Sequence, residues 1–112
     1  MELAEKVLSQ TVGVEERKIN VPEILAAVSR YYNIEESDIV SRKRKRDIVQ
    51  ARQVVMYLAK ELTDASLAAI GAEMGGRDHS TVIYADRAIR DLLDTDTKFQ
   101  AELKEIRELL EV

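Results

Sequence analysis

Four consecutive polar residues, Asp78, His79, Ser80 and Thr81, follow shortly after the glycine pair Gly75–Gly76. They offer a carboxylate, an imidazole and two hydroxyls, all of which make hydrogen bonds. The glycines can end one helix and Asp78 can cap the next, so the polar run lies at the positive end of a helix dipole. Such a tip suits a groove lined with phosphates and base edges, although an ordinary helix–helix corner has the same local pattern.

The same residues give little support to catalysis or metal binding. His79 is the only histidine among the 112 residues, and the chain has no cysteine. No second imidazole and no thiolate is therefore at hand to complete a nucleophile–base pair or a common metal site. We expect no enzymatic activity, no cofactor and no metal in this chain.

A second group of side chains forms the basic loop, Arg42–Arg46, in which five cations are adjacent. The whole chain has a formal net charge of -4, yet residues 42–61 carry seven basic and two acidic side chains. Because salt screens charges beyond about 10 Å, a local basic patch acts independently of the net charge. The patch favours a polyanionic partner; a solvated surface run or a localisation signal is the alternative.

The elements that must position these groups are helices. The chain has one proline and four glycines and is rich in residues that favour helices, which indicates a single all-α domain. Apolar spacing predicts a short helix over 2–12 and one between Asn20 and Asn33. It also predicts helices over 35–40, 47–62, 67–74 and 79–93, and a last one that runs to Leu110.

Capping residues support these boundaries. Asn20, Ser66 and Asp78 are expected N-caps, and one of Asp94, Thr95 or Asp96 caps the last helix. The predicted core consists of inward apolar residues at helical spacing: Ile24, Leu25, Val28, Tyr32, Ile34, Ile39, Ile48, Ala51, Val55, Leu58, Leu62, Leu67, Ile70, Met74, Val82, Ala85, Ile89, Leu92, Phe99, Leu103, Ile106 and Leu110.

The helices over 67–74 and 79–93, joined by a glycine turn, form a helix-turn-helix. On the helix before them, Gln53 and Lys60 lie opposite the buried stripe and Arg52 lies on its flank. We expect these three side chains to extend the basic loop along one exposed face. Cations for phosphates and small polar groups for bases together predict sequence-specific binding of double-stranded DNA.

These residues also resemble a known family. The segments Arg52-Gln53, Lys60–Thr63 and above all Gly75–Val82 are similar to the C-terminal DNA-binding domain (domain IV) of the bacterial chromosomal replication initiator DnaA. The resemblance spans roughly residues 19–111. It implies an all-α, compact helical bundle that contains a Trp-repressor-like helix-turn-helix, preceded by a short linker helix.

The resemblance further implies binding to nine-base-pair DnaA boxes, broadly TTATNCACA, at the replication origin. Arg44 is expected in an AT-rich minor groove, Lys60 near a phosphate, and Asp78–Thr81 in the major groove. Whether Asp78 reads a base or only caps its helix stays open. The full set of expected DNA-binding residues is Arg42, Lys43, Arg44, Arg52, Gln53, Lys60, Ser66, Leu67, Arg77, Asp78, His79, Ser80 and Thr81.

The sequence departs from the family pattern in several places, including Asp47 and Gln50, which make the start of the helix over 47–62 less basic than in many relatives. Ser80 stands where threonine is usual, which removes a methyl group that can contact thymine but keeps the hydroxyl. Ala51 and Ala68 stand where proline is common. These changes bear on fine specificity and affinity.

We expect residues 1–18 to be a linker helix from an upstream domain that is missing here, and residues 19–112 to be the DNA-binding domain. ATP is expected for the full-length protein only, because the family's ATPase lies in such an upstream domain. The short first helix has Lys6 as its only base, so contact with acidic phospholipid near residues 1–18 should be weak.

We expect a monomeric and cytoplasmic domain. Alternatives are a stand-alone helix-turn-helix transcriptional regulator and a protein-interaction or membrane-surface module.

Overall fold

The computed structural model describes residues 19–110, which form helices and no strand. The helices are α2 (Val21–Tyr32), α3 (Glu36–Ile39), α4 (Arg46–Leu62), α5 (Leu67–Glu73), α6 (His79–Thr95) and α7 (Thr97–Leu109). This order confirms the expected all-α class and helix-turn-helix, and each predicted boundary in this range lies within two residues of the observed one. The helix expected over 2–12 lies outside the described residues.

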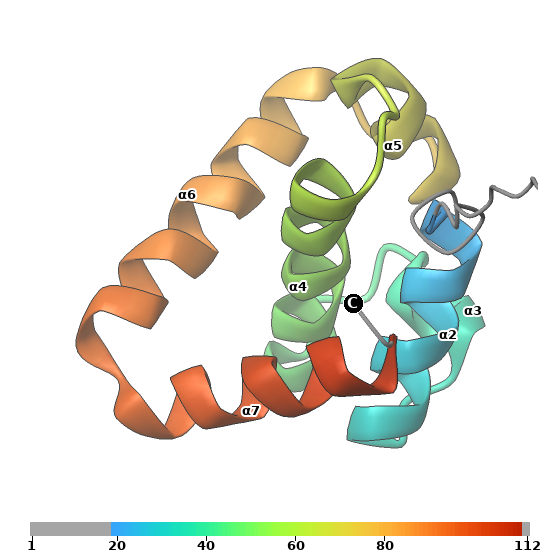
Figure 1. The fold of residues 1–112 in the computed structure, drawn as a ribbon. Helices are drawn as coiled ribbons and strands as arrows, with labels where there is room; N and C mark the ends of the chain where they lie inside the picture. Colours follow the sequence, from blue (N-terminus) through green and yellow to red (C-terminus); the bar gives the residue numbers. More distant parts are fainter. Residues whose placement is uncertain (1–18, 111–112) are drawn as a thin grey trace, which may run out of the picture.

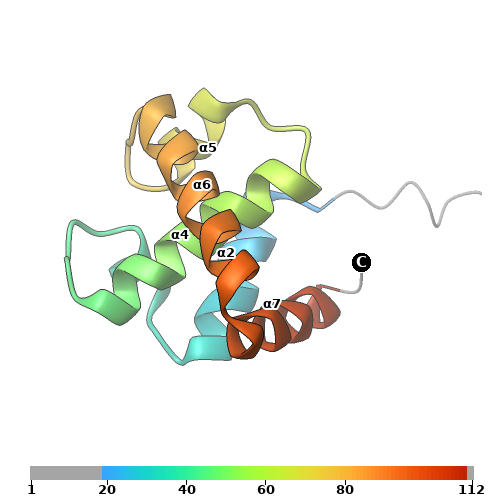
Figure 2. The same ribbon diagram turned by 90° about the vertical axis from the view of Figure 1, so that its left-hand side faces the viewer.

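Helix α4 runs through the middle of the bundle, with α2, α3, α5 and α6 packed around it (Figures 1 and 2). The stripe of buried residues on α4 is therefore wider than the sequence predicts. Besides Ala51, Val55 and Leu58, its residues Val54 and Met56 are buried. A helix that is enclosed by several neighbours buries more than the single face that its periodicity marks.

The predicted core is confirmed in most of its residues, and the exceptions lie at its edge. Six predicted core residues are only partly buried, although they pack against the core: Leu25, Tyr32, Ile34, Leu62, Leu67 and Leu92. Each of them therefore has one side against the core and another open to solvent.

The caps of α2 follow the sequence expectation. The Glu23 N–H donates to Asn20 Oδ1 at 2.9 Å, and the Asn20 N–H donates to Glu23 Oε1 at 3.1 Å, which completes a capping box. At the other end Asn33 adopts the left-handed conformation with φ 58°. The helix is therefore bounded by local hydrogen bonds as well as by packing.

Helices α6 and α7 meet at a sharp corner at Asp96, which caps α7 by accepting from the Phe99 N–H at 3.0 Å (Figure 1). Helix α7 then packs against α2. There the Tyr32 hydroxyl donates to Glu102 Oε1 at 3.1 Å and the Tyr31 hydroxyl donates to Glu105. The bond to Glu105 raises the pKa of Tyr31 to about 12.

The helix-turn-helix consists of α5, the α5–α6 turn at residues 74–78, and α6. Ser66 caps α5 as predicted, by accepting from the Ala69 N–H at 3.1 Å. Both Gly75 and Gly76 have positive φ, 89° and 79°, so the glycine pair supplies a backbone that other residues adopt at a cost. None of the helices in residues 19–110 is long and apolar enough to span a membrane.

Candidate nucleic-acid interface

The tip of α6, residues 78–81, is built around one carboxylate oxygen. Asp78 Oδ1 accepts from the Thr81 N–H at 3.1 Å, from the Thr81 hydroxyl at 3.0 Å and from the Ser80 hydroxyl at 2.8 Å. These bonds, that of Ser80 foremost, hold the pKa of Asp78 below its usual value. Asp78 is thus the N-cap of α6, while its second oxygen, Oδ2, accepts no hydrogen bond from residues 19–110.

The other side chains at the tip differ in how much they are exposed. His79 and Ser80 are exposed, and Thr81 is half-buried. The Ser80 hydroxyl is already bonded to Asp78, so it is oriented before any partner arrives. The tip therefore presents an imidazole, an oriented hydroxyl and one free carboxylate oxygen.

The α5–α6 turn is held close to α5 by its main chain. The Arg77 N–H donates to the Gly71 carbonyl at 2.8 Å. A Cβ atom at Gly71 would lie 2.0 Å from the Arg77 carbonyl oxygen, so only glycine allows this approach. The requirement for glycine at position 71 follows from contact between α5 and the turn.

Arg77 connects the turn to Val40 and Ser41, which lead into the basic loop, and its side chain is half-buried. Its guanidinium group donates to the carbonyls of Met74 in the turn, of Val40 at 3.3 Å and of Ser41 at 2.7 Å. Arg42 makes the reverse connection, because its Nη2 donates to the Gly75 carbonyl at 3.2 Å. The loop and the turn are therefore joined in both directions.

Arg52 corrects a sequence prediction. We expected it on an exposed face with Gln53 and Lys60, but it is only 7% exposed. Its Nε donates to the Ile39 carbonyl at 2.7 Å and its Nη2 donates to the Lys43 carbonyl at 2.9 Å. The end of α3 and the basic loop thus supply the carbonyls that hold this side chain inside the fold.

The arginines around the basic loop repel one another. Burial lowers the pKa of Arg52, and the charges of Arg77 and Arg42 lower it further. Burial and the charge of Arg42 likewise lower the pKa of Arg77. The three guanidinium groups are thus close enough to interact, although they come from the loop, α4 and the turn.

The remaining loop cations are exposed. Lys43 pairs with Asp38 at 2.8 Å, whereas Arg44 forms no hydrogen bond or ion pair within residues 19–110. Gln53 is half-buried and lines a shallow hollow of about 330 Å³ together with Arg44 and Arg46. Arg44 is therefore available to an outside partner, and Gln53 lies beside it.

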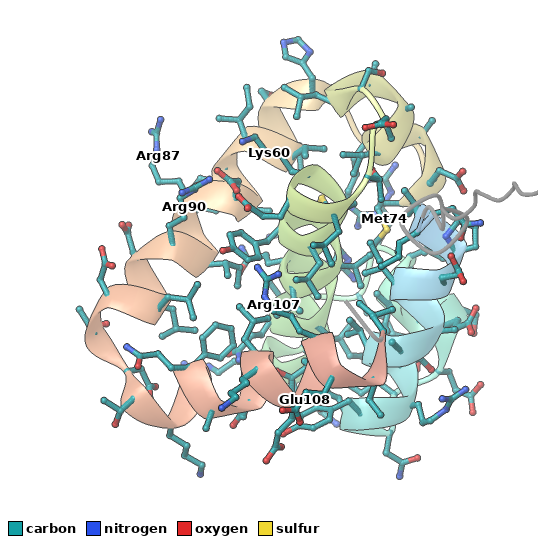
Figure 3. All side chains as sticks on the ribbon, viewed as in Figure 1. Lys60, Met74, Arg87, Arg90, Arg107 and Glu108 are labelled. Carbon is teal, nitrogen blue, oxygen red and sulfur yellow. The ribbon has the colours of Figure 1, made fainter. Side chains whose placement is uncertain are left out.

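Lys60 belongs to a charged network between α4 and α6. Its Nζ lies 3.8 Å from Asp86 Oδ2, which also accepts from Arg90 Nε at 2.9 Å. Arg90 additionally pairs with Glu61 at 2.9 Å. Figure 3 shows Lys60 and Arg90 next to α6 on the side of α4, while Arg87 points away from the bundle. Lys60 is exposed but already has a carboxylate neighbour.

Two further expected site residues belong to α5. Ser66 is exposed and serves as the N-cap, and Leu67 is half-buried against the core. Two large apolar residues on α6 that the sequence pattern did not mark, Ile83 and Tyr84, are 39% and 67% exposed. The signal for them was available, because they follow His79 and Ser80 by four positions and so share their face of the helix.

Comparison with known proteins assigns the sequence that folds in this way to a family. The model of the family described as bacterial dnaA protein helix-turn-helix matches residues 21–89. The chain is similar to the chromosomal replication initiator protein DnaA of Brucella abortus, with 47% identity over 96 residues, or 86% of the chain and 19% of the relative.

Two other relatives carry the same name. The protein of Ruegeria pomeroyi is 45% identical over 111 residues, which cover 99% of the chain and 24% of the relative. That of Bacteroides thetaiotaomicron is 40% identical over 110 residues, which cover 98% of the chain and 23% of the relative. The chain thus spans a quarter or less of the length of these relatives. Because the family match includes the basic loop, α5, the turn and the tip of α6, the chain belongs to the bacterial DnaA helix-turn-helix family.

Proposed function

We propose that this chain is the DNA-binding domain of a replication initiator and binds duplex DNA of the DnaA-box type. The observation that carries the proposal is the connection of the α5–α6 turn to the basic loop through Arg42 and to Ser41, directly before that loop, through Arg77. A cationic loop and a polar helix tip at fixed separation can contact backbone and base edges of one duplex together. The names of the relatives support the same function.

Arg44 is the proposed contact in the minor groove. Its side chain is exposed and has no partner among residues 19–110, so entering a groove breaks no bond to that part of the chain. AT-rich DNA has a narrow minor groove with concentrated negative potential, which attracts a guanidinium group. The preference for an AT-rich half of the box follows from this contact.

The tip of α6 is the proposed contact in the major groove. Asp78 caps the helix through Oδ1 and can accept from a cytosine amine through Oδ2, so capping and base reading are compatible in one side chain. His79 can donate to a base acceptor or contact a thymine methyl group. Ser80 can donate or accept, although its hydroxyl must then leave or share its bond with Asp78.

The other expected residues take supporting roles in this proposal. Lys60 and Lys43 approach phosphates, in competition with their carboxylate neighbours Asp86 and Asp38. Gln53 contacts the DNA backbone beside Arg44. Ser66 and Leu67 bring the start of α5 to the same DNA strand. Arg52 and Arg77 act mainly from within, by holding the loop and the turn in place.

Fluorescence anisotropy with a labelled duplex tests the function. We expect the chain to bind a duplex with one DnaA box at least tenfold more tightly than a scrambled duplex of the same composition. Arg44→Gln should weaken binding to the box about tenfold, because one contact of a charged group is lost. Lys98→Gln serves as a matched control, since Lys98 is exposed on α7.

Equal affinity for the box and the scrambled duplex would contradict the sequence specificity. An equal loss in Arg44→Gln and Lys98→Gln would contradict the role of the basic loop.

The same proposal includes a monomeric, cytoplasmic domain. Any weak contact with acidic phospholipid belongs to residues 1–18, outside the described residues; liposome flotation with and without them tests it.

A further inference from the structure

A buried carboxylate lies between α4 and α6. Within residues 19–110, Asp86 and Arg52 are the only charged residues that are buried, and the Asp86 side chain is 12% exposed. One of its oxygen atoms, Oδ1, is buried and accepts no hydrogen bond from this part of the chain. A carboxylate that is shielded from water in this way acts strongly on the charges next to it. Asp86 therefore has a strong influence on the cations at the contact between α4 and α6.

Arg90 holds the Asp86 carboxylate in place. Its Nε donates to Asp86 Oδ2 at 2.9 Å, one turn away on α6, and this bond raises the pKa of Arg90. The guanidinium group of Arg90 also pairs with Glu61 of α4 at 2.9 Å and lies 5.9 Å from the centre of the Tyr57 ring. Arg90 thus contacts both helices, so the carboxylate cannot turn toward solvent without losing an anchored partner.

Lys60 is attracted to the same carboxylate but makes no hydrogen bond to it. The Lys60 Nζ atom lies 3.8 Å from Asp86 Oδ2, beyond hydrogen-bond distance. The Lys60 side chain is 37% exposed, and its ammonium group forms no hydrogen bond within residues 19–110. Its three N–H donors therefore remain for an outside acceptor, and charge attraction keeps the side chain beside α6.

A DNA phosphate at Lys60 would share the ammonium group with Asp86. Two negative groups beside one cation repel each other, and the anchored carboxylate does not move away from the phosphate. The pair of Lys43 and Asp38 differs, because these side chains are 59% and 32% exposed and separate into water at little cost. Resting on the proposed function, we propose that Asp86 limits the affinity for DNA by competing with a phosphate for Lys60.

A double-mutant cycle between Asp86 and Lys60 tests this inference. Binding to the box duplex is measured by fluorescence anisotropy for the parent chain, Asp86→Asn, Lys60→Gln and the double variant. Asparagine keeps an oxygen for the Arg90 N–H and removes the charge, so Asp86→Asn should bind the box about threefold to fivefold more tightly. In the Lys60→Gln background the same substitution should change the affinity by less than about twofold, because the cation for which Asp86 competes is absent.

Asp91→Asn is the matched control. Asp91 is an exposed carboxylate of α6 whose side chain has no ion pair within residues 19–110, so this variant changes the net charge equally. Its affinity for the box should stay within about twofold of the parent value. Asp86→Ser is a second neutral variant, and circular dichroism melting verifies that each variant folds. A substitution that only loosens the contact between α4 and α6 weakens binding, whereas the loss of a competitor strengthens it.

The outcomes separate this inference from the proposed function. The cycle is run on the box duplex and on a scrambled duplex, because both contain phosphates. No preference of the parent chain for the box contradicts the proposed function, whereas a gain that depends on Lys60 still supports the inference on either duplex. Parental or weaker affinity in both neutral variants overturns the inference. An equal gain with and without Lys60, or in Asp91→Asn, also overturns it, because the effect then comes from net charge.

Discussion

The guanidinium groups of Arg52 and Arg77 donate to main-chain carbonyls at the end of α3 and in the segment between α3 and α4. Two residues that we expected to contact DNA thereby support the basic loop and the segment before it from within. Hydrogen bonds from charged donors contribute more than those from neutral donors, so these two side chains matter for the shape of the interface.

We expect Arg77→Lys to destabilise the chain although it keeps the charge. A lysine has one nitrogen and cannot reach the carbonyls of Val40, Ser41 and Met74 from one position. The free energy of unfolding should fall by about 1–3 kcal/mol, because carbonyls lose their donors. Urea unfolding monitored by circular dichroism measures this.

Arg87→Lys is the control for Arg77→Lys, since Arg87 is exposed on α6 and points away from the bundle (Figure 3). It should change the free energy of unfolding by less than about 0.5 kcal/mol. Equal effects of the two substitutions would show that Arg77 does not hold the loop.

We expect Asp78 to give the fold an acid-sensitive contribution. Its folded pKa lies below the unfolded value of 3.8, so the ionised form stabilises the fold above that value. The stabilisation is lost as the pH falls through the folded pKa. Asp78→Asn keeps an oxygen cap without a titrating group, so its thermal midpoint should fall less than that of the parent between about pH 5 and about pH 3. Parallel curves for the two proteins would refute this.

At the scale of elements, the helix boundaries were predictable because they depend on local chemistry. The capping box at Asn20 and Glu23 and the caps at Ser66, Asp78 and Asp96 each act within three residues. The apolar periods of α6 and α7 were predictable for the same reason. Sequence patterns capture interactions whose partners are neighbours in the chain.

The burial of Arg52 was not predictable, because its partners lie 13 positions away at the end of α3 and nine positions away in the irregular segment that follows. Helical periodicity places the side chain on a flank, but only the path of the loop decides whether carbonyls meet it there. The roles of Arg42 and Arg77 depend on contacts 33 and 36 residues apart, which no local pattern records. The site residues lie in short motifs that the sequence reveals, but the contacts that arrange them join segments far apart in the sequence.

The glycine pair in the turn allows a matched test of close packing. Gly75 and Gly76 share a positive φ, so alanine at either position carries a backbone cost of about 1–2 kcal/mol. At Gly75 the new Cβ would also lie 2.3 Å from the Val40 carbonyl oxygen, whereas at Gly76 nothing lies within 4 Å. Gly75→Ala should therefore lose about 1–3 kcal/mol more than Gly76→Ala in urea unfolding. Equal losses would mean that the end of α3 moves away freely.

At the scale of the whole molecule, the chain separates its charges. A net charge of -4 coexists with a basic loop whose guanidinium groups share a hollow with α4 and the turn. Acidic groups more than about 10 Å from the basic loop repel DNA bound there only weakly, because salt screens charges over that distance. The net charge of a small domain is therefore a poor guide to its polyanion binding.

The salt dependence of DNA binding measures how this separation of basic and acidic charges affects the affinity. We expect the logarithm of the association constant to fall linearly with the logarithm of salt concentration. Lys60→Gln should reduce the slope by about 0.9, since one phosphate contact disappears. Lys98→Gln should leave the slope unchanged, and a reduced slope in that variant would point to diffuse charge in place of individual contacts.

The two-way connection between the basic loop and the α5–α6 turn has a kinetic consequence for the proposed complex. When either the basic loop or the tip of α6 dissociates from the duplex, the bonds of Arg42 and Arg77 keep that part close to its DNA contact, at a high effective concentration. Rebinding of that part is then faster than dissociation of the whole protein, and full release requires the basic loop and the α6 tip to dissociate at the same time. A few hydrogen bonds inside the protein thus set how long the DNA stays bound.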